Sequence, residues 1–298
     1  MRDSKKLHPD LQVYLAFGLY QCYKKGLHVR ITETNRTIGE QNNYYNQGYS
    51  QVKGNDFGSM HQWGVAFDVC RNDGSGAYDF TNWIDKVAKI YKSYPLAWGG
   101  DWKGFVDQPH FQMKVYEDSY GGTGKLKRTY SNPDVFRKKW KKSLIKEQFA
   151  DLNITRTKAL LEKKFTQTNR NSCSVWKGVK TISKTDSLSK GTPIYIIKDM
   201  GDGRSHIVYI KKNKIKTGYI YNFTLVKKLS LFSKLTLAAN KKIYNNKYNS
   251  VTKKVTKGSN ANIVLPKGTK VRFIVQRGNW IKIRYKWEGK HKIGWIAK

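Results

Sequence analysis

Cysteine is scarce in this chain of 298 residues, and its three copies, Cys22, Cys70 and Cys173, lie far apart. An odd number of widely spaced cysteines provides neither a disulfide framework nor a Cys-x-x-Cys metal knuckle. The chain also lacks any run of 18 apolar residues, so we expect no transmembrane helix. Its charged opening is not followed by an apolar segment and a small-residue cleavage site, so we expect no signal peptide.

Acidic residues are also few, with 21 Asp+Glu against 57 Lys+Arg and a net charge of +36. Residues 1–145 hold 22 basic and 14 acidic side chains, a net charge of +8, which leaves +28 (36 − 8) for the remainder. Such an excess favours a polyanionic partner, because bound Lys and Arg release that partner's counterions. Nucleic acid, anionic cell-wall polymers and acidic membranes all meet this condition, and charge alone does not choose among them.

Aromatic residues are plentiful, with 9 Trp, 19 Tyr and 12 Phe, so compact cores can form. The length suggests two or three domains of roughly 100–200 residues each. Apolar periodicity predicts an α+β domain over residues 1–144. Its expected helices are 10–25, 37–47 and 80–91, and its expected strands are 27–32, 65–69 and 111–115.

The C-terminal half contains a polar stretch and then a repeat. Residues 145–171 are rich in Lys, Thr, Asn and Gln, which predicts a linker that is helical around residues 156–165. The sequences Lys190-Gly-Thr to Gly218-Tyr-Ile and Lys267-Gly-Thr to Gly294-Trp-Ile share an alternating pattern. Two copies of one unit with strand periodicity predict two small all-β barrels, at 172–228 and 229–298.

The most informative segment is Ser59-Met-His61-Gln-Trp-Gly64-Val-Ala-Phe-Asp68, with Asp107-Gln-Pro-His110-Phe downstream. Two histidines and a carboxylate leave a fourth position for water, which is the pattern of a catalytic zinc site. Residues seven apart span about 10.5 Å along a helix and about 23 Å along a strand. The chain must therefore bend between His61 and Asp68, and Gly64 offers a flexible point. Spacing alone shows only that a shared site is feasible, and it favours the alternative of an ordinary core or surface histidine with a nearby solvated aspartate.

The pattern Ser-x-His-x-x-Gly-x-Ala-x-Asp followed by Asp-x-Pro-His-Phe resembles the zinc peptidases of the D-alanyl-D-alanine carboxypeptidase/L-alanyl-D-glutamate endopeptidase family. The likeness is greatest to phage endolysins and bacterial autolysins of the endopeptidase branch. It extends to Leu7-His-Pro and to Arg36-Thr-x-x-Glu-Gln41, and it covers residues 5–116. One departure is Gly48-Tyr49, where relatives often have a basic residue after the glycine, so substrate contacts there are in question.

The resemblance implies roles for seven residues and one zinc ion. His61, Asp68 and His110 would bind the zinc, and Asp107 would be the catalytic carboxylate. Arg36 would bind substrate oxygens and stabilise the charge that develops on them. Ser59 and Gln41 are candidates for substrate contact, with a turn role for Ser59 and a structural role for Gln41 as the alternatives.

The implied function is an endolysin-type peptidoglycan hydrolase that cleaves the L-alanyl-D-glutamate bond of stem peptides. One alternative is a D,D-carboxypeptidase that removes terminal D-Ala, and another is a non-catalytic basic wall-binding protein. The C-terminal repeats resemble bacterial SH3-like wall-binding modules, whose expected ligands are wall peptides or anionic wall polymers. No base-reading motif is present, so we expect no nucleic-acid partner. The resemblance also implies synthesis in the host bacterial cytoplasm and release to the wall through holes made by a holin.

Overall fold

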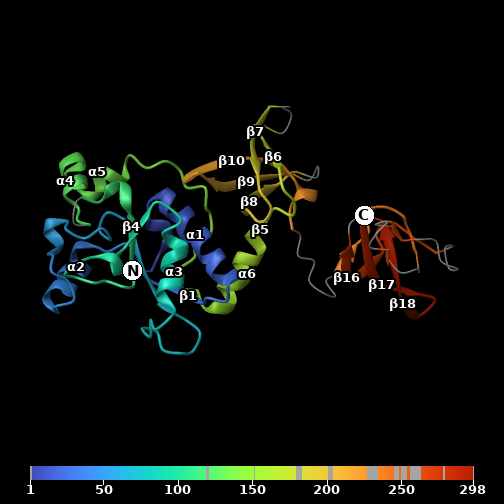
Figure 1. Cartoon of the computed structure of the whole chain (residues 1–298), viewed down its shortest axis with the longest axis horizontal. Coiled ribbons are helices and arrows are strands. Elements are labelled where there is room, and N and C mark those ends of the chain that lie inside the picture. The colour runs from blue at the N-terminus through green and yellow to red at the C-terminus, as the bar shows by residue number, and fades with distance from the viewer. Residues whose placement is uncertain are drawn as a thin grey trace. The chain divides into compact units, whose positions relative to one another are not determined.

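The protein is described here by a computed structural model (Figure 1). The described residues are 2–118, 121–150, 152–178, 183–200, 204–226, 234–244, 248–249, 254–255, 263–277 and 279–297. The chain divides into two compact units, residues 1–226 and residues 227–298. Among the described residues, no helix has the length and apolar character needed to cross a bilayer.

A four-stranded antiparallel sheet organises the N-terminal part of the first unit, with strand order β1-β2-β4-β3. Its strands are β1 (Val29–Glu33), β2 (Ala66–Arg71), β3 (Leu96–Trp98) and β4 (His110–Met113). Helices α1 (Pro9–Lys24) and α3 (Ile84–Tyr91) pack against each other, and α1 also contacts β1 (Figure 1). Helices and strands thus mix as the sequence predicts.

Helix α1 is a core helix, because its apolar residues are buried nearly all the way around it. His8 caps its first turn by accepting a hydrogen bond from the Asp10 backbone N–H, and Pro9 occupies the first helical position. Pro suits that position because its missing N–H would have no partner there. Gly18 lets α3 approach, since a Cβ at this position would run into the Tyr91 ring.

Helix α2 (Ile38–Asn46) begins with the capping box that its sequence predicts. The Glu40 backbone N–H donates to Thr37 Oγ1 at 3.2 Å, and the Thr37 backbone N–H donates to Glu40 Oε2 at 2.8 Å. This cap fixes the start of the helix, and therefore fixes Arg36 just before it and Gln41 in its first turn.

Two predicted elements differ from the observed ones. The helix expected over residues 80–91 begins only at Ile84, and the strand expected over residues 111–115 is β4 followed by a 3-10 turn, η4 (Lys114–Tyr116). Other short helices of this part are η1 (Ser4–Lys6), η2 (Gly54–Asp56), η3 (Gly99–Asp101), α4 (Gly124–Tyr130) and α5 (Pro133–Arg137). Element ends are where local sequence patterns are weakest.

Residues 145–171, expected to be a linker, contain several buried side chains among mostly exposed or partly buried ones. Helix α6 (Ile154–Lys164) lies in this segment, close to the predicted helical stretch. Phe149 and Phe165 join the same core as α1, and the Phe165 ring stacks on Tyr20 with centroids 4.8 Å apart. A few large apolar residues are enough to pack the segment, although its average composition is polar. The division of the chain into peptidase domain, linker and two modules remains a prediction.

A second sheet of the first unit has six strands in the order β5-β8-β9-β10-β6-β7. Its strands are β5 (Phe165–Gln167), β6 (Cys173–Trp176), β7 (Lys184–Leu188), β8 (Pro193–Asp199), β9 (Arg204–Lys211) and β10 (Lys214–Tyr221), and the 3-10 turn η5 (Asn222–Thr224) follows. Tyr195 and Val208 of this sheet belong to the core that contains α1. The N-terminal α+β region and the first repeat therefore share one hydrophobic core.

The described residues of the second unit, residues 227–298, also lie mainly in strands. Its largest sheet has the order β11-β16-β17-β18 and is accompanied by the pairs β12-β15 and β13-β14. The strands are β11 (Lys234–Thr236), β12 (Lys241–Lys242), β13 (Tyr248–Asn249), β14 (Lys254–Val255), β15 (Val264–Leu265), β16 (Lys270–Arg277), β17 (Trp280–Trp287) and β18 (Lys290–Ala297).

The two sequence repeats form matching antiparallel meanders, β8-β9-β10 and β16-β17-β18. Gly218 lies opposite Ile207 in the first meander, and Gly294 lies opposite Ile283 in the second. Within the described residues the sheets are open, so closed SH3-like barrels remain a prediction. The boundary expected between the two modules, at 228–229, lies outside the described residues.

Candidate metal centre and active site

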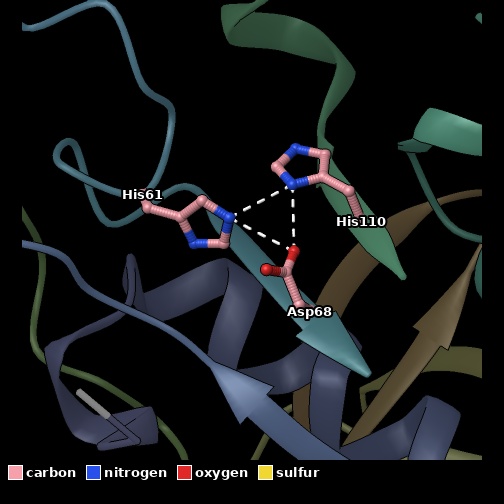
Figure 2. Close-up of side chains that lie close together, drawn as sticks. All are labelled: His61, Asp68 and His110. Carbon is pink, nitrogen blue, oxygen red and sulfur yellow. Dashed lines mark hydrogen bonds and ion pairs between the residues drawn. The ribbon is translucent and has the colours of Figure 1, made fainter. Parts of the chain in front are cut away.

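Three side chains from different elements meet at one end of the N-terminal sheet (Figure 2). Asp68 on β2 and His110 at the start of β4 are directly opposite each other in the strand pairing. His61 lies in the turn that precedes β2, and Gly64 in this turn has a φ of +68°. That left-handed conformation suits glycine. The bend predicted between His61 and Asp68 is present at Gly64.

The ligand atoms of these side chains converge on one point. His61 Nε2 is 3.1 Å from His110 Nδ1 and 3.2 Å from Asp68 Oδ1, and His110 Nδ1 is 3.0 Å from Asp68 Oδ1. Ligands of a tetrahedral zinc ion with bonds near 2.0–2.2 Å lie about 3.3 Å apart. The donor set therefore fits a zinc ion in its chemistry and in its spacing.

Hydrogen bonds on the outer edges of the two imidazoles set the tautomer of each ring. They thereby determine which ring nitrogens direct a lone pair toward the centre of the site. His61 Nδ1 lies 2.7 Å from the Thr34 carbonyl oxygen, which can only accept, so Nδ1 carries the proton. His110 Nε2 lies 2.9 Å from Gln112 Oε1, so that nitrogen carries the proton of the second ring. His61 Nε2 and His110 Nδ1 are left unprotonated, as metal ligation requires.

The electrostatics of this cluster favour a bound cation. Burial would raise the pKa of Asp68, but the charges and hydrogen bonds of His61 and His110 outweigh it and hold that pKa well below its usual value. Burial would lower the pKa of His110, but the hydrogen bond and charge of Asp68 raise it. The cluster thus stabilises a negative carboxylate at Asp68, and a metal ion bound between it and the two neutral rings would supply the balancing positive charge.

Asp107 lies in the turn before β4, three residues ahead of His110. Its backbone N–H donates to the Gly99 carbonyl at 3.0 Å, and its carbonyl accepts from the His110 N–H at 3.2 Å. Gly99 permits this close turn, because a Cβ there would meet the Asp107 backbone. Burial raises the pKa of Asp107, and the nearby charges of His110, His61 and Arg36 oppose this. No described residue donates a hydrogen bond to its side chain, which leaves the carboxylate free to accept one.

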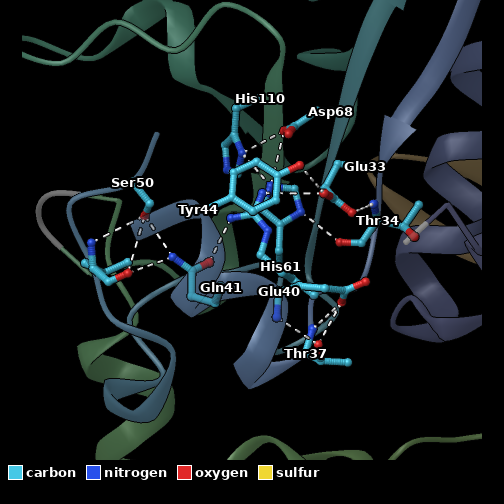
Figure 3. A network of polar contacts seen from close by, with 12 residues as sticks. Glu33, Thr34, Thr37, Glu40, Gln41, Tyr44, Ser50, His61, Asp68 and His110 are labelled. Atoms are coloured by element: carbon cyan, nitrogen blue, oxygen red, sulfur yellow. Dashed lines mark hydrogen bonds and ion pairs between the residues drawn. The ribbon is translucent and has the colours of Figure 1, made fainter. Parts of the chain in front are cut away.

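Arg36 is held on several sides by Glu33, Gln41 and Tyr44, which are labelled in Figure 3. Its NH1 donates to Gln41 Oε1 at 2.8 Å, and its NH2 lies 3.8 Å from Glu33 Oε2. Its guanidinium lies over the Tyr44 ring, 4.2 Å from the centroid. The Tyr44 hydroxyl donates to the same Glu33 oxygen at 3.2 Å. The side chain is only 9% exposed, and its Nε is buried without a hydrogen-bond partner.

Gln41 and Ser59 lie in different surroundings. Gln41 is 0% exposed, and its amide nitrogen donates to Ser50 Oγ and the Val52 carbonyl while its oxygen accepts from Arg36. Ser59 is partly buried two residues before His61, and its hydroxyl pairs with none of the described residues. Trp102, also partly buried, packs against the His110 ring with centroids 5.2 Å apart.

Sequence reasoning missed four residues that support the site: Glu33, Thr34, Tyr44 and Gln112. A backbone carbonyl such as that of Thr34 has no signature in the sequence. Gln112 did have one, because residues two apart on a strand point to the same face, and it follows His110 by two. Glu33 lies opposite Asp68 in the β1–β2 pairing, which only strand register reveals.

Comparison with known proteins links this geometry to a peptidase family. The family described as D-alanyl-D-alanine carboxypeptidase matches residues 53–113. The chain is 37% identical over 124 residues to the peptidoglycan L-alanyl-D-glutamate endopeptidase CwlK of Bacillus subtilis (strain 168), covering 36% of this chain and 73% of that relative. It is 38% identical over 116 residues to the L-alanyl-D-glutamate peptidase of Listeria phage A118, covering 37% of this chain and 40% of the phage protein. A solved structure, the L-Ala D-Glu endopeptidase ChiX of Serratia marcescens, is 24% identical with a TM-score of 0.32, covering 37% of this chain and 82% of that one.

Proposed function

Because the chain belongs to the peptidase family of D-alanyl-D-alanine carboxypeptidases and L-alanyl-D-glutamate endopeptidases, we propose that it hydrolyses the L-alanyl-D-glutamate bond of peptidoglycan stem peptides. The observation that carries this proposal is the convergence of His61, Asp68 and His110 on one point. The proposed substrate is inferred from the two relatives, which are both named as peptidases of the L-alanyl-D-glutamate bond.

The cofactor is one zinc ion, in keeping with the family, and His61, Asp68 and His110 would hold it. A zinc ion bound there supplies a Lewis acid and brings the pKa of a coordinated water toward about 7. Two neutral imidazoles and one carboxylate leave the site open on its fourth side, as a catalytic centre needs.

Asp107 is the proposed general base. Its carboxylate is partly buried, is near the charges of both histidines, and accepts no hydrogen bond from the described residues. A carboxylate so placed can take a proton from the attacking water and deliver it to the leaving amine. The turn that it shares with His110 keeps it at a fixed reach from the reacting atoms.

Arg36 is the proposed substrate-binding cation that stabilises the developing oxyanion. Its unpaired Nε and its long contact to Glu33 leave hydrogen-bonding capacity unused. Gln41 is fully buried and fully paired, so we now assign it the positioning of Arg36 in place of substrate contact. Ser59, whose hydroxyl is unpaired within the described chain, remains the candidate for substrate contact near His61.

Analysis of the products released from purified peptidoglycan tests this function. An endopeptidase of the proposed kind exposes new N-terminal D-glutamate. The family match to a D-alanyl-D-alanine carboxypeptidase favours one alternative, a D,D-carboxypeptidase, which would release free D-Ala instead. A folded, zinc-loaded protein that yields free D-Ala and no new D-glutamate amino group would refute the proposed bond.

The two C-terminal repeats are proposed to attach the enzyme to the wall. Residues 146–298 have a net charge of +28, and the matching meanders have the strand content of small binding modules. Anionic wall polymers or wall peptides are the ligands that this charge and the resemblance favour. Holin-dependent release stays a prediction of the resemblance.

A further inference from the structure

Gln112 lies within β4, two residues beyond the metal-ligand candidate His110, and is 1% exposed. Its amide nitrogen donates to Glu117 Oε2 at 2.8 Å and to the Gly121 carbonyl oxygen at 2.8 Å. A side-chain amide nitrogen has two hydrogens, so both are in use. Because both neighbours are acceptors, the amide nitrogen must face them, and the amide oxygen must face the other way.

The amide oxygen faces His110, whose Nε2 is 2.9 Å away. An amide oxygen only accepts, so His110 Nε2 is the protonated nitrogen in the neutral ring. The lone pair then lies on Nδ1, which faces Asp68 Oδ1 at 3.0 Å. If the amide turned over, its NH2 group would face Nε2 and the ring proton would move to Nδ1, where it would block a metal ion.

The two histidines differ in how securely their tautomers are set. His61 donates to the backbone carbonyl of Thr34, a group that cannot turn over. His110 depends on a side-chain amide, whose two ends are nearly the same in shape. The orientation of that amide is decided by Glu117 and Gly121, and within the described residues Glu117 forms no hydrogen bond or ion pair with the three ligand side chains.

We propose that Glu117 and Gln112 form a relay that fixes the tautomer of His110 and so sets the metal affinity of the site. Gln112 is the positioning residue that contacts the ligand, and Glu117 is the residue that orients Gln112. Outer hydrogen-bond partners of metal-binding histidines commonly change metal affinity about 10–100-fold when removed. The proposal rests on the proposed function only for the identity of the metal.

Zinc affinity of the metal-free full chain, measured by competition with a chromophoric chelator, tests the relay. Gln112→Met keeps the length of the side chain but removes the acceptor, and we expect zinc affinity to fall about 10–100-fold. Glu117→Met removes the acceptor that orients Gln112, so it should also lower zinc affinity. Glu117→Gln can still accept from the Gln112 amide through its own amide oxygen, so we expect this variant to bind zinc within about threefold of the original chain, with a similar cobalt(II) absorption spectrum.

Gln12 provides a matched control. It is also a buried glutamine, and it donates to the carbonyls of Lys5 and Leu7, but it lies outside the site. Gln12→Met should lower the thermal unfolding midpoint and leave zinc affinity unchanged. A role for Gln112 in core stability alone predicts the same behaviour for Gln112→Met, and that result would overturn the relay.

The two variants at position 117 keep the proposal falsifiable if Gln112→Met does not fold. Folded Glu117→Met and Glu117→Gln proteins that bind zinc equally well would also overturn the relay. The failure of the proposed function looks different, because the original chain would then bind zinc tightly but expose no D-glutamate amino group. That result would leave the relay proposal intact and would refute the proposed substrate.

Discussion

The Arg36 guanidinium lies over the Tyr44 ring, with its central carbon 4.2 Å from the ring centroid. Because Tyr44 also donates to Glu33, which faces the same arginine, the three side chains hold one another in place. A ring beneath a partly desolvated guanidinium contributes about 0.5–2 kcal/mol. The arrangement fixes a cation next to the proposed catalytic centre without using all of its donors.

Tyr44→Leu should therefore lower kcat/KM on a stem-peptide substrate about tenfold, which corresponds to roughly 1.4 kcal/mol. Zinc content should not change, because Tyr44 is not among the three candidate ligands. Tyr44→Phe is the matched variant, since it keeps the ring and removes only the hydroxyl. We expect it to retain most activity, and an equal loss in both variants would mean that the ring does not position Arg36.

Substitution of a metal ligand and substitution of the proposed base should affect zinc binding and activity differently. His61→Ala removes one of three converging ligand atoms, so it should lose both zinc and activity. Asp107→Asn keeps the size of the side chain but cannot accept a proton, so kcat should fall about 10²–10⁴-fold with zinc retained. Metal analysis and peptide hydrolysis on the same samples check both results. A chain that binds no zinc and releases no new amino groups from walls, with or without Asp107→Asn, would favour a purely wall-binding protein.

Gly64→Ala should destabilise the peptidase domain more than the same replacement at a left-handed glycine that has open space around it. The residue has a φ of +68°, and a Cβ there would lie 2.8 Å from the Lys6 carbonyl oxygen and 2.9 Å from the Trp140 ring. Gly26→Ala is the control, because its φ is +73° and no atom lies within 4 Å of the added Cβ. The control should cost about 1–2 kcal/mol from backbone conformation alone. Denaturant unfolding should show a larger loss for Gly64→Ala, and equal losses would contradict the packing argument.

Stability should fall as pH drops below about 6.5, the usual pKa of histidine, partly because of His8. Burial lowers the pKa of His8, against the smaller opposing charge of Asp10, so the folded state favours the neutral ring. The contribution of His8 to stability is complete above the pKa that its ring has in the unfolded chain. It is lost as pH falls toward the lower pKa that the ring has in the folded protein. His8→Asn can still accept from the Asp10 N–H but does not titrate. Its unfolding midpoint should depend less on pH between 7.5 and about 5, and an unchanged slope would exclude His8.

Two truncations should differ, because the first repeat shares a core with the peptidase region. A chain ending at residue 226 keeps the first compact unit, so small-peptide hydrolysis should survive while wall binding weakens in a salt-dependent way. A chain ending at residue 171 loses Tyr195 and Val208 from the core around α1, so its unfolding midpoint should fall markedly. Equal wall binding by the first truncation at all salt concentrations would show that residues 227–298 are not an anchor.

The sequence by itself determined the elements whose cause is local. The capping box at Thr37 and Glu40, the apolar period of α1, and the strand repeats around Gly218 and Gly294 all follow from neighbouring residues. The order of His61, Gly64 and Asp68 also predicted a bend, because no regular element brings residues seven apart onto one ion.

Only the tertiary structure decided which atoms face the proposed metal and what holds them. The pairing of Asp68 with His110 depends on strand register, and the tautomers depend on Thr34 and on Gln112, which are distant or unremarkable in sequence. The polar average composition of residues 145–171 gave no sign that Phe165 packs against α1 or that Phe149 packs against Phe165. Local patterns report propensity, whereas hydrogen-bond direction and burial arise only when distant segments are brought together.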